Sequence, residues 1–190
     1  MRTKKELRAQ YKSLRKQITE AERESASLAI AERFINFLAE DPKIQTIHVF
    51  LPIAKQREPD TFLIIKKLLE EKKEVYSSVL LPSGEMQSIR LNSASIFEEG
   101  DLGIPIPKEL EFSDKAMIQL VLVPLLVYDT HGNRIGYGKG YYDQFLASLK
   151  NDVVKVGLSY FAPEEIIENE AHDIPLDYCI TPQSLYSFEK

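Results

Sequence analysis

The stretch from Leu120 to Val127 constrains the fold more than any other part of this sequence, because it holds only aliphatic residues and one proline. A strand with this composition has no polar face to turn toward water, so we expect it at the centre of a sheet covered on both faces. Sheets of that kind are built largely from parallel strands connected by helices. The stretch therefore predicts an α/β fold with this strand in the middle.

Segments with helical spacing alternate with segments rich in β-branched and aromatic residues along most of the 190-residue chain. The second helix is expected to begin at a capping box formed by Thr19 and Glu22. Glycines and prolines within residues 92–116 predict a long irregular connection. No repeat or linker divides the sequence, so we expect one domain over residues 1–190, with a largely parallel central sheet flanked by helices. The expected helices cover residues 3–17, 19–39, 61–73 and 141–149, and the expected strands cover residues 44–51, 75–81, 86–91, 153–160 and 178–181.

Four of the eight glycines fall within nine residues, and we expect them to follow the central strand directly. Glycine allows positive φ angles and close backbone approach, so alternating glycines can aim several main-chain N–H groups at one anion. Ligands of open α/β sheets bind at the carboxyl ends of the strands, and the start of the next helix adds partial positive charge. This position favours a phosphate-binding loop over a glycine-rich turn with solvated charges. The four glycines are Gly132, Gly136, Gly138 and Gly140.

Two cations, Arg134 and Lys139, belong to the same loop, and together with the glycines they suit a nucleoside triphosphate. The loop is not a Walker A motif, because Lys139 is followed by Gly140 rather than by serine or threonine. Its glycine spacing also differs from the GxGxxG of dinucleotide-binding folds. We therefore predict an ATP-dependent enzyme outside both of these groups.

The charge distribution limits the partners of the chain. The net charge is -5, although residues 1–16 hold seven basic residues and Glu6 as their only acid. An acidic body with one basic patch argues against nucleic-acid binding and suits a small anionic ligand. With Cys179 as the only cysteine, no apolar signal region and no apolar run near the ~20 residues that span a membrane, we expect a cytoplasmic protein without membrane contact. No dimerisation segment is evident, and we expect a monomer.

Four motifs, in the same order along the chain, resemble those of the 5-formyltetrahydrofolate cyclo-ligase family, also called methenyltetrahydrofolate synthetase. The glycine loop resembles the family's N-R-[LI]-G-[YR]-G-[GK]-G-Y-Y-D, and the first helix carries K-x-x-L-R. A third segment is similar to E-x-[DE]-T, and the last resembles H-D…L-D…T. They correspond to Asn133–Asp143, Lys4–Arg8, Glu58–Thr61 and His172–Thr181.

The resemblance implies a fold similar to the isomerase and CoA-transferase-like group, and an enzyme that converts 5-formyltetrahydrofolate to 5,10-methenyltetrahydrofolate. ATP would be the co-substrate, released as ADP and phosphate, with Mg²⁺ required. In the mechanism proposed for the family, the formyl oxygen takes the γ-phosphoryl group, N10 attacks the activated carbon, and phosphate leaves as the ring closes. Such phosphoryl transfer depends mainly on positioning and on charge neutralisation.

The resemblance also implies roles for individual residues. Lys4 and Arg8, on one helix face, would contact the ATP phosphates; without the resemblance they read as a solvated basic stripe. Arg134 and Lys139 would stabilise the transferred charge. The other implied ATP contacts are Ile135, Gly136, Tyr137, Gly138, Gly140, Tyr141 and Tyr142.

Carboxylates and flat side chains complete the implied site. Asp143 and Asp177 would bind Mg²⁺, a cation that prefers oxygen ligands, although helix-start charge and turn capping are simpler roles for them. Glu58 would pair with the donor edge of the pterin, although it also fits an exposed loop glutamate. The implied folate contacts are Leu51, Glu58, Tyr137, Tyr141 and Phe161, of which Phe161 equally suits core packing.

Two departures from the family pattern concern the folate side. The segment from Leu51 to Glu58 is longer than expected, and Leu125 stands where the family often has glycine, so its side chain is expected to alter the pocket wall.

Two other functions compete with the main one. An isomerase or CoA-transferase-like enzyme would need Glu58 or Asp60 as base or nucleophile, and a non-catalytic nucleotide- or folate-binding protein would not need Lys139. His48 is expected to be structural.

Overall fold

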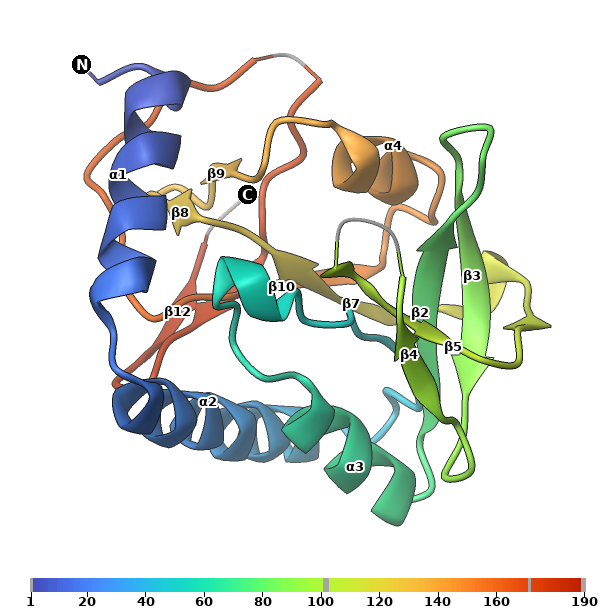
Figure 1. The fold of residues 1–190 in the computed structure, drawn as a ribbon. Coiled ribbons are helices and arrows are strands. Elements are labelled where there is room, and N and C mark those ends of the chain that lie inside the picture. The colour runs from blue at the N-terminus through green and yellow to red at the C-terminus, as the bar shows by residue number, and fades with distance from the viewer. Residues whose placement is uncertain (1, 101–102, 171, 189–190) are drawn as a thin grey trace.

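The first five residues of the aliphatic stretch form a central strand of the largest sheet, as predicted. In the computed structural model, which describes residues 2–100, 103–170 and 172–188, this sheet has eight strands in the order β12-β11-β10-β7-β1-β2-β3-β6 (Figure 1). β7 (Leu120–Pro124) lies between β1 (Thr46–His48) and β10 (Val154–Leu158) and runs parallel to both.

The outer strands complete a sheet that is parallel in its middle and antiparallel at its edges. β2 (Glu74–Leu80) runs parallel to β1, and β11 (Tyr178–Ile180) runs parallel to β10. β3 (Met86–Leu91), β6 (Glu111–Phe112) and β12 (Leu185–Ser187) each run antiparallel to the strand beside them. The expectation of a largely parallel central sheet is confirmed, whereas β12 was not predicted from the sequence.

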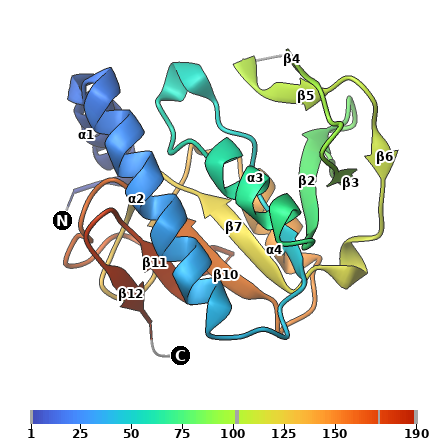
Figure 2. The same cartoon turned by 90° about the horizontal axis from the view of Figure 1, so that it is seen from below.

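Helices cover both faces of the sheet. α2 (Glu20–Ala39) and α3 (Phe62–Glu70) lie on one face, and α4 (Tyr141–Ala147) lies on the other (Figure 2). Neighbouring residues of β7 therefore belong to different cores: Leu122 packs in the cluster of α2 and α3, and Val123 packs in the cluster of α4. This double burial is why the strand is apolar at every position.

A short hairpin separates β7 from the glycine loop. β8 (Val127–Tyr128) pairs antiparallel with β9 (Arg134–Ile135), so the expectation that the central strand reaches Val127 and leads directly into the loop is wrong. The side chains of Leu125 and Leu126, between β7 and β8, are fully buried in two different clusters. The apolar pattern therefore continues through a place where the strand ends.

Gly132 lies in the turn of this hairpin rather than in the loop itself. Its φ angle is +81°, and a Cβ at this position would lie 2.8 Å from the carbonyl oxygen of Leu176. Glycine is required here for close packing of the hairpin against the segment before β11. Only the other three glycines of the cluster belong to the candidate phosphate loop.

α1 (Lys4–Gln17) crosses one end of the molecule and contacts β8 and β9 (Figure 1). Thr3 and Glu6 form a capping box at its start, and Thr19 and Glu22 form the predicted capping box of α2. The apolar stripe of α1 is buried against the hairpin, with Leu7 packed in one cluster with residues of β8 and β9. Both predicted N-terminal helices are thereby confirmed.

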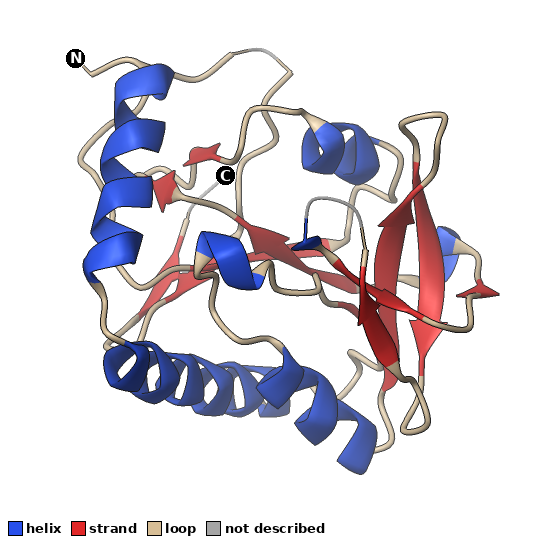
Figure 3. Ribbon diagram, in the orientation of Figure 1, coloured by secondary structure: helices blue, strands red, loops and turns tan. Residues whose placement is uncertain are grey.

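The connection expected over residues 92–116 is only partly irregular. β4 (Phe97–Glu99) and β5 (Pro105–Pro107) form a two-stranded hairpin, and a 3-10 turn occurs at η3 (Lys115–Met117). Another 3-10 turn, η1 (Ala54–Gln56), lies outside this connection, between β1 and α3. Figure 3 shows loops between the short strand β6 and its neighbours along the chain. Among the described residues no helix is long and apolar enough to cross a membrane.

Candidate functional site

The glycine loop, residues 136–140, connects β9 to α4 and is shaped by its glycines. Gly138 and Gly140 have φ angles of +87° and +70°, a region that strongly favours glycine. A Cβ at Gly138 would lie 3.2 Å from Cζ of Arg8, whereas the space that a Cβ would enter at Gly136 and Gly140 is open. One side of the loop is thus packed against α1, and the other side is accessible to a ligand.

The basic stripe of α1 faces this loop. Arg8 donates from Nε to the carbonyl oxygen of Gly136 at 3.0 Å, and Nζ of Lys12 lies 5.6 Å from the centre of the Tyr137 ring. The alternative of a purely solvated stripe does not describe these residues, because Lys4, Arg8 and Lys12 are all partly buried. Their spacing of four residues brings all three to one helix face.

Lys4 is paired with two acidic residues from the C-terminal part of the chain. Its Nζ lies 2.6 Å from Oδ2 of Asp173 and 2.7 Å from Oε1 of Glu170. Burial by itself would lower the pKa of Lys4, but the hydrogen bonds to these carboxylates outweigh burial and raise it. Among the described residues no carboxylate forms an ion pair with Arg8 or Lys12, so their charges remain available to an anion.

Arg134 and Asp143 form a second ion pair at the loop. Nη2 of Arg134 lies 2.7 Å from Oδ1 of Asp143, which also accepts from the main-chain N–H of Ile174 at 3.2 Å. The side chain of Arg134 is 4% exposed, and burial lowers its pKa, although the charges of Asp143 and Asp173 both act to raise it. Arg134 is therefore close enough to both Asp143 and Asp173 for their charges to act on it.

The protein could supply only part of the ligand set of a Mg²⁺ ion at this site. Asp143 and Asp173 supply carboxylates, and Mg²⁺ in nucleotide sites is typically held by one or two carboxylates together with phosphate oxygens. Within the described ranges no group of three or more His, Cys, Asp or Glu side chains is arranged to hold a metal. The residues present therefore fit Mg²⁺ that arrives with a phosphate ligand, and they do not form a closed protein cage.

Asp177, the other carboxylate that the resemblance implied for the metal, has a different setting. It precedes β11, and its Oδ2 accepts from the main-chain N–H of Lys155 at 2.8 Å and lies 2.8 Å from the Nζ atom of the same residue. The structure brings Asp173, rather than Asp177, to Lys4 and to the neighbourhood of Arg134. Sequence reasoning missed Asp173, although the His172-Asp173 pair was part of the motif that it used.

The remaining loop residues divide between surface and core. Lys139 is exposed, and Tyr141 is half-buried at the start of α4. Ile135 is buried against α1, and Tyr142 packs edge-on against His48 and Phe145 at 6.2 and 6.1 Å. Ile135 and Tyr142 are thus packed into the protein at the two ends of the loop, whereas Lys139 and Tyr141 are accessible to a ligand.

Glu58 lies in a buried hydrogen-bonded network rather than on an exposed loop. It is 2% exposed; its Oε1 accepts from the Tyr137 hydroxyl at 2.7 Å, and its Oε2 accepts from the main-chain N–H of Ile53 at 2.6 Å. Burial raises the pKa of Glu58, and the charge of Arg15 opposes that rise. Tyr137 thereby connects the glycine loop to the carboxylate implied for folate.

Other residues implied for folate face inward. Leu51 is buried in the core beneath α2 and α3, and Phe161 packs edge-on against Tyr11 with 5.4 Å between ring centres. The side chain of Leu125 points toward Gly157, where an added Cβ would lie 2.6 Å from its Cδ2 atom. The expected change in a pocket wall at Leu125 is thus not seen, because this leucine fills the core.

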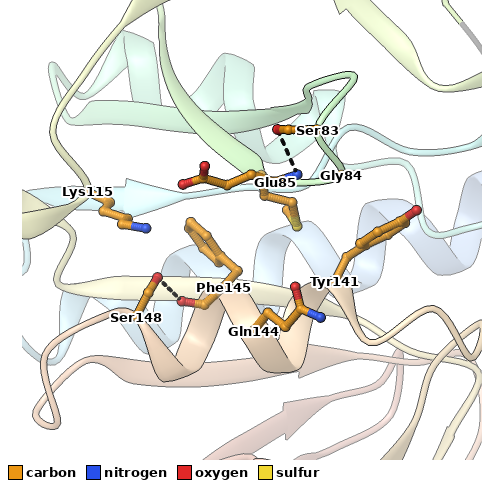
Figure 4. A pocket seen from close by; sticks show the side chains of 9 residues that line it. Ser83, Gly84, Glu85, Lys115, Tyr141, Gln144, Phe145 and Ser148 are labelled. Atoms are coloured by element: carbon orange, nitrogen blue, oxygen red, sulfur yellow. Dashed lines mark hydrogen bonds between the residues drawn. The ribbon is translucent and has the colours of Figure 1, made fainter.

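A hollow of about 280 Å³ opens beside the loop, between the tip of the β2–β3 hairpin and α4 (Figure 4). Tyr141, Gln144, Met86 and Lys115 are among its lining residues. Ligand pockets commonly measure ~300 to 1,000 Å³, so this hollow is too small to hold a nucleotide together with a second ligand. It is a side chamber that adjoins the loop through Tyr141.

Comparison with known proteins decides the family. The model of the 5-formyltetrahydrofolate cyclo-ligase family matches residues 1–182. The chain belongs to this family. The 5-formyltetrahydrofolate cyclo-ligase of Haemophilus influenzae is 26% identical over 182 residues, which cover 91% of this chain and 94% of that protein. The chain is therefore an enzyme of the cyclo-ligase family.

Solved structures show the same cyclo-ligase architecture. The NMR structure of the Aquifex aeolicus 5,10-methenyltetrahydrofolate synthetase matches with a TM-score of 0.84 and 29% identity, covering 98% of this chain and 93% of that chain. The synthetase of Mycoplasma pneumoniae matches with a TM-score of 0.76 and 23% identity, covering 94% and 98% of the two chains. The fold expected from the sequence resemblance is confirmed.

Proposed function

We propose that this cyclo-ligase family member converts 5-formyltetrahydrofolate to 5,10-methenyltetrahydrofolate, with transfer of the γ-phosphoryl group of ATP to the formyl oxygen and release of ADP and phosphate. The observation that carries the proposal is the position of Tyr137. Its backbone lies in the glycine loop under the cations of α1, and its hydroxyl donates to the buried Glu58 at 2.7 Å. A phosphate-binding loop and a carboxylate suited to a pterin are thereby joined by one side chain.

The ATP phosphates are proposed to lie on the open side of the loop. Arg8 and Lys12 offer charge that no described carboxylate neutralises, and exposed Lys139 extends from the loop itself. Lys4 and Arg134 are paired with carboxylates and would exchange these partners for phosphate oxygens when the nucleotide binds. Backbone N–H groups around Gly136 and Gly138 would supply further donors.

The proposed chemistry activates a poor electrophile. The formyl oxygen of the substrate attacks the γ-phosphorus, ADP departs, and the formyl carbon becomes bonded to a good leaving group. N10 then attacks this carbon, and the C–O bond breaks to release phosphate as the ring closes and N10 loses its proton. Arg134 and Lys139 would stabilise the charge on the transferred group, because phosphoryl transfer depends mainly on such neutralisation.

Asp143 and Asp173 are the residues we propose to hold Mg²⁺ together with the phosphates. When bound, the ion would neutralise phosphate charge. Asp143 and Asp173 would hold the ion beside the phosphates, and Lys4 and Arg134, released from these carboxylates, would contact the phosphate oxygens. Oxygen ligands of this kind are those that Mg²⁺ prefers.

Glu58 is proposed to recognise the pterin. An ionised carboxylate offers about four lone-pair positions, and the Tyr137 hydroxyl and the Ile53 N–H occupy one on each oxygen. The remaining positions suit the adjacent N–H donors at the edge of a pterin. The half-buried ring of Tyr141 would offer flat apolar surface to the same ligand.

The competing enzyme class has weaker support. An isomerase or CoA-transferase-like reaction needs a carboxylate base or nucleophile, and it would leave the basic residues of α1 that face the glycine loop without a role. Asp60 accepts at Oδ1 from the main-chain N–H of Phe62, the first residue of α3, at 3.0 Å. A cytoplasmic location and a monomeric state remain predictions. Light scattering would test the monomeric state.

One assay tests the proposal. The purified protein is mixed with 5-formyltetrahydrofolate, ATP and Mg²⁺, and 5,10-methenyltetrahydrofolate is followed by its ultraviolet absorbance while ADP is measured in parallel. We expect one ADP for each methenyl product and no product when ATP is omitted. Folded protein that forms no ATP-dependent product would overturn the proposal.

A further inference from the structure

We propose that Arg15 is a positioning residue for folate: it holds the Tyr137 hydroxyl and the Glu58 carboxylate in the arrangement that the pterin meets. This inference rests on the proposed function, because it assumes that Glu58 receives the pterin. Arg15 belongs to the last turn of α1 and is 2% exposed, so it acts through its neighbours and does not itself face the ligand.

The contacts of Arg15 form a continuous chain to the carboxylate. Its Nη1 donates to the Tyr137 hydroxyl at 2.8 Å, and that hydroxyl donates to Oε1 of Glu58 at 2.7 Å. Its Nη2 donates to the carbonyl oxygen of Leu125 at 2.5 Å. Because the Tyr137 hydroxyl accepts from Arg15, its own proton is directed toward Glu58. Arg15 thus fixes both the place and the polarity of this bond.

A second arginine, Arg57, connects the turn that carries Glu58 to the end of α1. Arg57, the neighbour of Glu58, has a left-handed φ angle of +50° and donates to the carbonyl oxygens of Arg15 and Ile18 at 3.1 and 2.5 Å. A cation bonded to the last carbonyls of a helix stabilises the end of that helix. The turn that carries Glu58 is therefore attached to the end of α1 by Arg57, while Arg15 reaches Glu58 through the Tyr137 hydroxyl.

The electrostatics agree with this geometry. Arg15 and Tyr137 face the carboxylate of Glu58, Tyr142 lies close enough to feel its charge, and Arg23 donates to its main-chain oxygen at 3.3 Å. Among these groups Arg15 is the cation whose charge lowers the pKa of the buried carboxyl, against the effect of burial. Without Arg15, Glu58 would take up a proton at higher pH, and its ability to accept from the pterin would be lost there.

Binding and kinetics of three variants test this role. Arg15→Met removes the donor and the charge, Arg15→Lys restores the charge without the planar fork, and Tyr137→Phe removes only the connecting hydroxyl. Arg33→Met is the matched control, because Arg33 likewise donates to a main-chain carbonyl, that of Pro182, and is partly buried elsewhere in the fold. Dissociation constants for 5-formyltetrahydrofolate and for ATP are measured by calorimetry, alongside KM and kcat.

We expect Arg15→Met to weaken folate binding about tenfold or more, with the ATP dissociation constant within about twofold of the original, because the donor to the Tyr137 hydroxyl and the buried charge that favours ionised Glu58 are lost on the folate side only. Arg15→Lys should recover part of the loss, and the low-pH limit of folate binding should move to higher pH in Arg15→Met. Tyr137→Phe should weaken folate binding in the same direction, and adding Arg15→Met to it should weaken binding by less than the sum of the two effects.

Each outcome separates the two proposals. If the unaltered protein neither binds nor converts 5-formyltetrahydrofolate, the proposed function fails. If it does both and Arg15→Met binds folate equally well, the role of Arg15 is refuted while the function stands. Equal losses for folate and ATP, or an unmoved pH limit, would also refute it, because they indicate general destabilisation. Should Arg15→Met not fold, Tyr137→Phe decides, since its ring packing is retained.

Discussion

The guanidinium group of Arg134 lies 2.7 Å from Oδ1 of Asp143, so a cation and a carboxylate of the same short motif neutralise each other. Lys4 and Asp173 repeat this arrangement at 2.6 Å across the chain. The cations that we propose to contact phosphate and the carboxylates that we propose to hold the metal are thus paired with one another. Binding of a Mg²⁺–nucleotide complex would exchange partners within this cluster, so no unpaired charge is left in either state.

Removing one partner of the buried pair should destabilise the fold. Arg134→Met leaves Asp143 without its cation, and we expect the free energy of unfolding to fall by about 2 kcal/mol, less than for a fully buried pair. Urea denaturation measures the change. Arg90→Met is the control, because Arg90 and Glu74 form a pair that is 46% and 44% exposed, and its effect should stay below about 0.5 kcal/mol. Equal effects for the two variants would contradict the assignment of a buried pair.

Lys139→Ala should reduce turnover without a change in stability. Lys139 is exposed and forms no ion pair with a described residue, so its loss costs the fold nothing. Loss of one transition-state donor commonly lowers kcat about 10²-fold. The absorbance assay and a thermal melt measure the two effects. Lys66→Ala, on the exposed face of α3, should leave both unchanged. Undiminished turnover in Lys139→Ala would refute the assigned role.

Asp173 and Asp177 can be distinguished by their response to Mg²⁺. Asp173→Asn should raise the Mg²⁺ concentration needed for half-maximal turnover about tenfold or more, as loss of a carboxylate ligand would. Asp177→Asn should leave that concentration unchanged and instead lower stability, because it breaks the pair with Lys155. Mg²⁺ titrations at saturating ATP provide the measurement. The reverse pattern would return the metal role to Asp177.

His48 should make the fold sensitive to acid. It is fully buried, Nε2 lies 2.7 Å from Oγ of Ser78, and burial lowers its pKa to about 3. The unfolded chain binds a proton near pH 6.5, so the contribution of His48 to stability is complete above that pH and is lost as the pH falls toward 3. At pH 5.5 the loss should be about 1.4 kcal/mol.

Urea denaturation at pH 7.5 and 5.5 measures this dependence. The decrease in stability between the two pH values should be smaller in His48→Gln than in the unaltered protein. His172→Gln serves as the control, because that side chain is 72% exposed and its removal should leave the decrease unchanged. If His48→Gln keeps the full decrease, other groups account for the acid sensitivity.

The sequence predicts best what depends on local contacts. Thr3 with Glu6 and Thr19 with Glu22 determine where α1 and α2 begin, and these boxes are closed within four residues of chain. The end of β7 could not be read in the same way. Leu125 and Leu126 are apolar because they enter two different cores, a distinction that hydropathy along the chain does not carry.

The site shows the same division. The glycine loop and the pair Lys4 and Arg8 are visible as sequence motifs. Arg15 is not visible in this way, because its contact with Tyr137 spans 122 residues of sequence. Asp173 is joined to Lys4 across 169 residues. Residues of these kinds are recognised only once the fold brings distant segments together.

The contact between Lys4 and Asp173 also bears on how the protein is made. The ribosome releases α1 long before the segment that contains Asp173. Lys4 therefore cannot form this ion pair while β7 and its neighbours assemble. The binding site would then be the last part of the molecule to mature. In refolding followed by pulsed hydrogen exchange, amides of β7 and β10 should gain protection before those of the glycine loop.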